Sequence, residues 1–147
     1  QLNDLTQRKA VAFERLVACG VVKPYPGVVD LVKAQAGVRP VAICSGAVRS
    51  DIVPVIKALG IADHFQVLVT AEDVPSSKPD PACYRLAVER LGGGLLGRDC
   101  VAIEDTPAGI TAAKGAGLRV IAVTNTYGRD KLFGADRLVT SLAGLRV

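Results

Sequence analysis

The sequence contains no tryptophan, no methionine and a single histidine, and aromatic residues make up only 4% of it. Its four cysteines have none of the close spacings that mark zinc sites or redox-active pairs; they are Cys19, Cys44, Cys83 and Cys100. Without such pairs we expect the cysteines to be reduced and to serve as small hydrophobic side chains. This indicates a reducing, cytoplasmic setting. No apolar run reaches the roughly 18 residues that a membrane span needs, so we expect no membrane partner.

Clusters of basic residues are also missing. The 18 lysines and arginines exceed the 14 acidic residues and give a net charge of +4, but they are scattered along the chain. Nucleic-acid binding requires basic residues gathered on one surface, so we expect no nucleic-acid partner. A small anionic substrate agrees with the modest positive charge. Half of the 147 residues are apolar, which is enough for a globular domain with a sizeable core.

The first part of the chain differs from the rest. Residues 2–18 have apolar side chains at helical spacing and are followed by Gly20, which predicts one amphipathic helix. Pro24 and Pro26 then fix the backbone and exclude a helix, so residues 23–27 are expected to form a hinge. The helix before this hinge is expected to belong to a different layer from the rest of the chain.

After the hinge, short apolar runs alternate with helical segments. This alternation indicates βαβ units and a parallel sheet, and the abundance of small aliphatic residues suits strands that helices cover on both faces. Asp80 and Thr106 are expected to cap helices that have a proline at their first position. The strands are expected at 41–44, 65–69, 101–103, 119–123 and 138–139, and the helices at 28–36, 51–59, 81–91 and 107–116.

Polar residues directly follow most of the expected strands. They are Ser45, Thr70, the pair Glu104 and Asp105, and Thr124. In a parallel sheet with right-handed crossovers these strand ends share one edge, where ligands of α/β proteins bind. Two adjacent carboxylates at that edge indicate a hard cation with oxygen ligands, most simply Mg²⁺. The alternative is a solvated loop that carries two ordinary surface acids.

Two further segments could hold an anion. Ser45 and Gly46 form a strand-to-helix turn, where a hydroxyl and a backbone amide can bind a phosphate oxygen, although a helix start needs the same residue types. Lys78 lies in a loop that Pro79 and Pro81 restrict, so its ammonium group could face an anion or carboxylates. The alternative for Lys78 is an ordinary surface lysine.

The order of these features is more specific than any one of them. A serine at a strand end, a lysine in the segment Ser-Lys-Pro-Asp-Pro and the segment Ile-Glu-Asp-Thr-Pro-Ala-Gly-Ile resemble motifs of the haloacid dehalogenase-like superfamily, in its capped phosphatase and β-phosphoglucomutase-like subgroup. The resemblance implies a Rossmann-like α/β core, with a parallel sheet and helices on both faces. It also implies that residues 1–22 are the last helix of a helical cap, 23–27 the hinge and 28–147 the core.

The resemblance also implies roles for individual residues. Ser45 and the Gly46 amide would bind phosphoryl oxygens, and Lys78 would bridge the phosphoryl group and the nucleophile. Asp105 would bind Mg²⁺, with Glu104 as a second metal ligand or in the outer shell. The expected substrate is a small phosphorylated metabolite.

One element of the family pattern is missing. The superfamily's first strand ends in Asp-x-Asp, whose first aspartate attacks phosphorus to form an aspartyl-phosphate, and no Asp-x-Asp occurs in this sequence. We therefore expect the nucleophile, the general acid/base and the first strand to lie upstream of Gln1, and the core of the chain as given to be incomplete and inactive. A phosphomutase of the same fold and a non-catalytic binding module are the alternatives.

Overall fold

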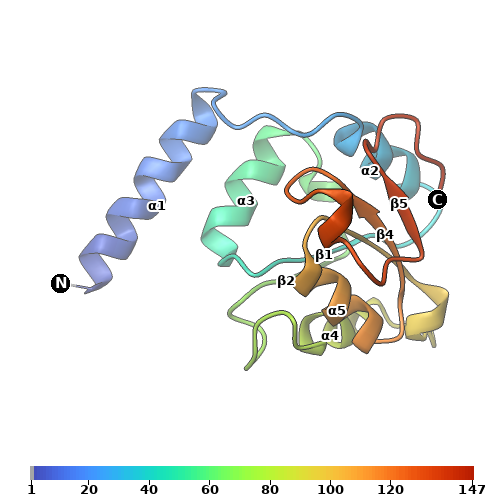
Figure 1. Cartoon of the computed structure of the whole chain (residues 1–147). Coiled ribbons are helices and arrows are strands. Elements are labelled where there is room, and N and C mark those ends of the chain that lie inside the picture. The colour runs from blue at the N-terminus through green and yellow to red at the C-terminus, as the bar shows by residue number, and fades with distance from the viewer. Residues whose placement is uncertain (1) are drawn as a thin grey trace.

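A computed structural model describes residues 2–147; the side chains of residues 1–7, Ala10 and Glu14 lie outside the description. The chain alternates helices and strands, as expected (Figure 1). The helices are α1 (Leu2–Ala18), α2 (Val28–Ala36), α3 (Arg49–Ala58), α4 (Ala82–Leu91) and α5 (Pro107–Gly115). The strands are β1 (Ala42–Cys44), β2 (Val67–Val69), β3 (Val101–Glu104), β4 (Arg119–Val123) and β5 (Arg137–Val139). Three short 3₁₀ helices cover Ala62–His64, Gly97–Asp99 and Arg129–Lys131.

All strand pairs in the described residues are parallel, but they form two sheets. β1 pairs with β2, with Ala42 opposite Val67, and a second sheet has the order β3-β4-β5. β1 and β3 therefore each keep one edge without a strand partner in this part of the chain. The expected α/β fold with a parallel arrangement is confirmed, and its division into two sheets is a feature that the sequence pattern did not predict.

Helices cover both faces of the three-stranded sheet. On one face, α5 packs against β3 and β4, where Val120 and Ala122 are fully buried, and α4 continues this layer over β1 and β2, where Val69 is fully buried. On the other face, Leu31 of α2 packs with Val123 and with the C-terminal segment. Full burial of a valine or isoleucine side chain stabilises a fold by roughly 1.5–3 kcal/mol, so these two clusters hold the layers together. They keep the carboxyl ends of the strands in fixed positions.

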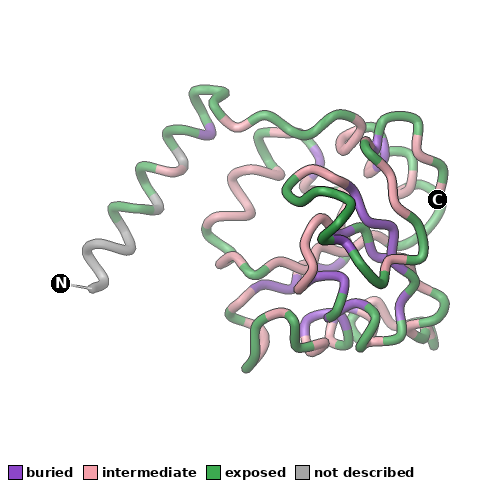
Figure 2. Tube along the Cα trace, viewed as in Figure 1, coloured by how far each residue is buried: buried purple, intermediate pink, exposed green. Residues whose placement is uncertain are grey.

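Helix α1 lies outside these two clusters. It packs against α3, and Lys9 Nζ forms an ion pair with Asp51 Oδ2 at 3.1 Å. Most of its described side chains are exposed (Figure 2). The chain then passes the C-terminal segment so closely that a Cβ atom on Gly27 would lie 2.2 Å from the backbone nitrogen of Ala143. Within residues 2–147, no helix has the length and apolar character that crossing a bilayer requires.

Two helix starts differ from the prediction. Helix α3 begins at Arg49 and not at residue 51, which places Pro54 inside the helix, beyond the first turn. Helix α4 begins at Ala82, and Pro81 occupies the cap position that was expected for Asp80. Asp80 Oδ1 still accepts a hydrogen bond from the backbone nitrogen of Ala82 at 2.8 Å, so its carboxylate satisfies an amide of the first turn. The start of α4 thus shifts by one residue and that of α3 by two.

Candidate functional site

Lys78 joins the carboxyl ends of the two sheets. Its ammonium group donates to the Cys44 carbonyl at the end of β1 at 3.1 Å and forms a close ion pair with Glu104 at the end of β3. Its side chain is only 18% exposed. The loop before α4 holds it there, because the prolines at 79 and 81 restrict the backbone and the Asp80 amide bonds the Ser77 carbonyl at 3.0 Å. Lys78 is therefore not an ordinary surface lysine.

Glu104 points into the protein. Its side chain is 6% exposed, and its Oε1 accepts hydrogen bonds from Lys78 and from the hydroxyl of Tyr84. Its Oε2 accepts from the Thr106 hydroxyl at 3.4 Å. A Cβ atom on Gly109 would lie 1.8 Å from Oε2, so the carboxylate occupies space that only glycine leaves open at that position. Breaking up a buried charged pair of this kind is expensive because it leaves an unpaired charge.

Asp105 has different partners from its neighbour. It follows the last residue of β3, is partly exposed and accepts a hydrogen bond from the hydroxyl of Thr126. Adjacent side chains of an extended chain point in opposite directions, which explains why the two acids separate. Thr106 follows and caps the start of α5. Its hydroxyl accepts a hydrogen bond from the Gly109 amide at 3.0 Å, as expected for the cap.

Ser45 and Gly46 directly follow Cys44, whose carbonyl accepts the hydrogen bond from Lys78. The Ser45 amide donates to the Val69 carbonyl at 2.9 Å, which fixes the turn, and the Ser45 hydroxyl accepts the Ala47 amide at 3.1 Å. Gly46 is exposed, and a Cβ atom at this position would have no neighbouring atom within 4 Å. The geometry thus brings a hydroxyl, a backbone amide and an ammonium group to one edge. Thr70 is also at a strand end, but it is fully buried and bonded to Asp73.

Of the two adjacent acids, Asp105 is the one whose carboxylate could hold a metal ion. Among the described residues, no group of three acidic, histidine or cysteine side chains forms a ready metal cluster. Mg²⁺ does not need one, because it keeps several waters and is bound through one or two carboxylates together with substrate phosphates. Asp105 offers such a carboxylate, whereas both oxygens of Glu104 already have protein partners.

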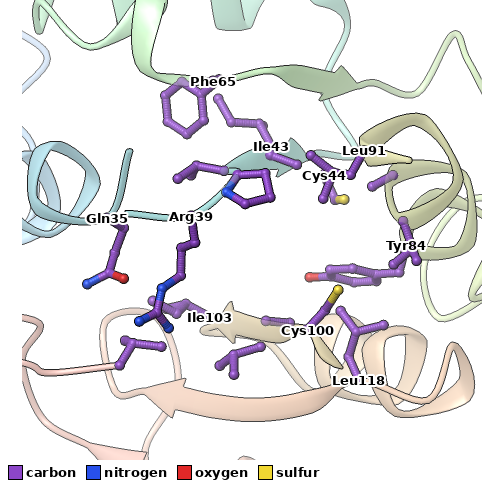
Figure 3. Close-up of a pocket in the computed structure, with 18 of the residues that line it drawn as sticks. Gln35, Arg39, Ile43, Cys44, Phe65, Tyr84, Leu91, Cys100, Ile103 and Leu118 are labelled. Atoms are coloured by element: carbon purple, nitrogen blue, oxygen red, sulfur yellow. The ribbon is translucent and has the colours of Figure 1, made fainter. Parts of the chain in front are cut away.

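An apolar slot separates β1 from β3. The slot is a cavity of about 500 Å³, and its lining includes Ile43 and Cys44 of β1, Ile103 of β3, and Cys100, which directly precedes β3. Figure 3 shows the two strands on either side of it, with the side chains of Tyr84 and Arg39 pointing into it. Ile103 is 36% exposed, although its neighbour Ala102 in the same strand is buried. The slot adjoins the edge of the site, because its lining includes Cys44, whose carbonyl bonds Lys78, and Tyr84, whose hydroxyl bonds Glu104.

Two members of this site were not predicted from the sequence. Tyr84 lies in the first turn of α4 and does not follow a strand, and Thr126 follows β4 by three residues. The scarcity of aromatic residues is the one signal that could have drawn attention to Tyr84. For Thr126 the signal is Thr124, two residues earlier, which was expected at the edge of the sheet where the parallel strands end.

A family model for haloacid dehalogenase-like hydrolases matches residues 3–117. The chain belongs to the haloacid dehalogenase-like hydrolases. Over 154 aligned residues it is 34% identical to the protein CbbY of Cereibacter sphaeroides, covering 98% of this chain and 64% of that protein. It is also 34% identical over 102 residues to the fructose-1-phosphate phosphatase YqaB of Escherichia coli, covering 69% of this chain and 53% of the relative.

The fold of this hydrolase chain also matches a solved structure of the family. A crystal structure of a CbbY variant from Rhodobacter sphaeroides with xylulose-(1,5)bisphosphate superimposes with a TM-score of 0.85 at 34% identity, covering 97% of this chain and 65% of that one. The predicted membership of the family and its Rossmann-like core are therefore confirmed. The chain spans about half to two thirds of the length of these relatives.

Proposed function

We propose that this chain is the larger part of a Mg²⁺-dependent phosphatase that hydrolyses a small phosphate ester through an aspartyl-phosphate. The observation that carries the proposal is the position of Lys78, whose ammonium group bonds the Cys44 carbonyl at the end of β1, one residue before Ser45, and pairs with Glu104 at the end of β3. A fixed positive charge at this point stabilises the charge that develops on a transferring phosphoryl group. Relatives named as phosphatases of sugar phosphates support the reaction class and a small phosphorylated metabolite as substrate.

Each residue of the site has a task in this mechanism. The Ser45 hydroxyl and the Gly46 amide bind phosphoryl oxygens, and Lys78 neutralises charge on the phosphoryl group and on the attacking carboxylate. Asp105 holds Mg²⁺, which when bound supplies further positive charge to the phosphate. Glu104 acts in the outer shell, because its oxygens are bonded to Lys78, Tyr84 and Thr106.

The attacking carboxylate is proposed to lie on a strand upstream of Gln1. The slot supports this, because β1 and β3 run parallel to their own neighbours and each has an edge without a strand partner among residues 2–147. Neighbouring strands lie about 4.8 Å apart, so one extended segment of apolar residues would bond to both edges and join the sheets. The carboxyl end of such a strand would emerge beside Lys78. We call the chain together with this segment the longer protein.

The test is hydrolysis of p-nitrophenyl phosphate by the longer protein. We expect activity that needs Mg²⁺, is abolished by EDTA and falls by about 10²-fold or more in Lys78→Ala and Asp105→Asn, because each variant removes charge stabilisation. Lys131→Ala, at an exposed lysine, is the matched control and should keep full activity. The 147-residue chain alone should hydrolyse the ester no faster than buffer.

Two results would contradict the proposal. Strong activity of the 147-residue chain would show that the nucleophile does not lie upstream. Near wild-type rates in both Lys78→Ala and Asp105→Asn would remove these residues from the site.

A further inference from the structure

The hydroxyl of Tyr84 lies inside the charged cluster of the site. Tyr84 belongs to α4, is 7% exposed and donates a hydrogen bond to Glu104 Oε1, the same oxygen that pairs with Lys78. Lys78 Nζ also lies 3.4 Å from the Tyr84 hydroxyl and 4.9 Å from the centre of its ring. One tyrosine therefore contacts both partners of the ion pair, through its hydroxyl and through its aromatic face.

The surroundings of Glu104 leave its carboxylate few other positions. Gly109 of α5 packs so closely against Oε2 that any side chain there would displace it, and the Thr106 hydroxyl bonds the same oxygen. Burial and the nearby charge of Glu104 raise the pKa of Tyr84, so the hydroxyl keeps its proton and remains a donor. A phenylalanine could fill the same space in the core, but it could not supply this hydrogen bond.

We propose that Tyr84 is a positioning residue, which fixes the Glu104 carboxylate and through it holds the Lys78 ammonium between β1 and β3. Its role in the reaction rests on the proposed function, but the positioning itself does not. Lys78 has a long, flexible side chain that loses conformational entropy when it is fixed, and a preformed set of acceptors offsets that cost before any ligand binds. Without the hydroxyl, Glu104 would lose a donor and Lys78 would have more than one position.

The positioning can be tested by NMR of the lysine ammonium groups in the ¹⁵N-labelled chain, at mildly acidic pH and low temperature. An ammonium group held by acceptors exchanges slowly with water, so Lys78 should give a resolved signal, identified by its loss in Lys78→Arg. Tyr84→Phe should broaden or remove this signal while the backbone amide spectrum stays that of a folded chain. Tyr127→Phe, at an exposed tyrosine, should leave it unchanged.

Three results of this experiment would overturn the proposal. They are the absence of a Lys78 signal from the wild-type chain, an unchanged signal in Tyr84→Phe, and its loss in Tyr127→Phe. Should Tyr84→Phe fail to fold, the wild-type chain still decides: a Tyr84 hydroxyl proton protected from exchange supports the proposal, and rapid exchange with water overturns it.

Kinetics of the longer protein give a second readout. In Tyr84→Phe we expect kcat for p-nitrophenyl phosphate to fall by about ten- to a hundredfold, as for other residues that orient catalytic groups, with KM within a factor of about two. Equal loss in Tyr127→Phe would contradict a specific role. Absence of phosphatase activity from the wild-type protein would count against the proposed function alone, because the ammonium signal reports on positioning without turnover.

Discussion

At the scale of single residues, the site depends on how β3 ends. Glu104 is its last residue and turns toward Lys78 and Tyr84, while Asp105 leaves the strand and meets Thr126. Two adjacent carboxylates thus reach different surroundings, and only one stays available to a cation. The same rule of alternating side chains buries Ala102 in the core and leaves Ile103 partly exposed on the opposite side of β3.

Thr126 is expected to orient Asp105 for the metal ion. Thr126→Val removes the hydroxyl that bonds the Asp105 carboxylate, so the Mg²⁺ concentration for half-maximal activity of the longer protein should rise by about tenfold or more. Thr111→Val is the matched control, because that hydroxyl bonds only the Pro107 carbonyl within α5. An unchanged Mg²⁺ dependence in Thr126→Val would separate Thr126 from the metal site.

The cysteines are expected to differ sharply in reactivity. Burial raises the pKa of the Cys44 thiol to about 12, so almost none of the thiolate that attacks alkylating agents exists at neutral pH. Cys19 is exposed, so iodoacetamide should modify it first in the folded chain. Cys44 and Cys83 should react only after unfolding, which peptide mass spectrometry can follow. Early modification of Cys44 would mean that solvent and reagent enter the slot freely.

At the scale of elements, sequence reasoning succeeded where one local signal decides. The proline and threonine at the start of α5 fix its first residue, and α2, β4 and β5 lie where expected, within one residue. Sequence reasoning was less accurate for α3, which was expected to begin at residue 51. The helix begins at Arg49, although this places Pro54 beyond the first turn, where its missing N–H leaves one helical hydrogen bond unmade. Tyr84 was missed because its role depends on contacts with residues far away in the sequence.

The turn after β2 should make stability depend on pH. Hydrogen bonds from the Thr70 hydroxyl and amide, together with Arg90, hold the pKa of Asp73 well below its usual value. A depressed pKa in the folded state contributes stability that is present above the unfolded pKa of about 3.9 and is lost as the pH falls further toward the folded pKa. Urea unfolding of wild type and Asp73→Asn should therefore differ at neutral pH and converge in strong acid.

A difference between the two proteins that persists unchanged in strong acid would contradict this assignment. It would mean that Asp73 stabilises the turn through its shape and neutral hydrogen bonds, since its charge would then contribute nothing.

At the scale of the whole molecule, the slot is the feature that no local pattern predicts. The strand segments were located correctly, but the pattern cannot tell whether β1 and β3 are neighbours, because pairing depends on the complete set of strands. In the described residues, the carboxyl ends of β1 and β3 are linked by Lys78 rather than by backbone hydrogen bonds. An upstream strand would add two backbone ladders to this single side-chain link.

Closure of the slot can be measured through Ile103. In the 147-residue chain its side chain is 36% exposed, so in Ile103→Lys the ammonium group can reach water and the loss of stability should be small. In the longer protein the inserted strand would cover the same position and bury the charge, which should cost about 3 kcal/mol or more in urea unfolding. Phe133→Lys is the control at a position that is 77% exposed, and it should cost little in either protein.

The comparison depends on the difference between the two proteins rather than on either value alone. An equal loss in both would mean that the upstream segment does not cover Ile103, and the two sheets would then remain separate in the longer protein. A large loss confined to the longer protein would place the new strand against β3, because the mutated side chain points into the slot from that strand. The same strand would bring its last residue beside Lys78, where the proposed reaction needs a nucleophile.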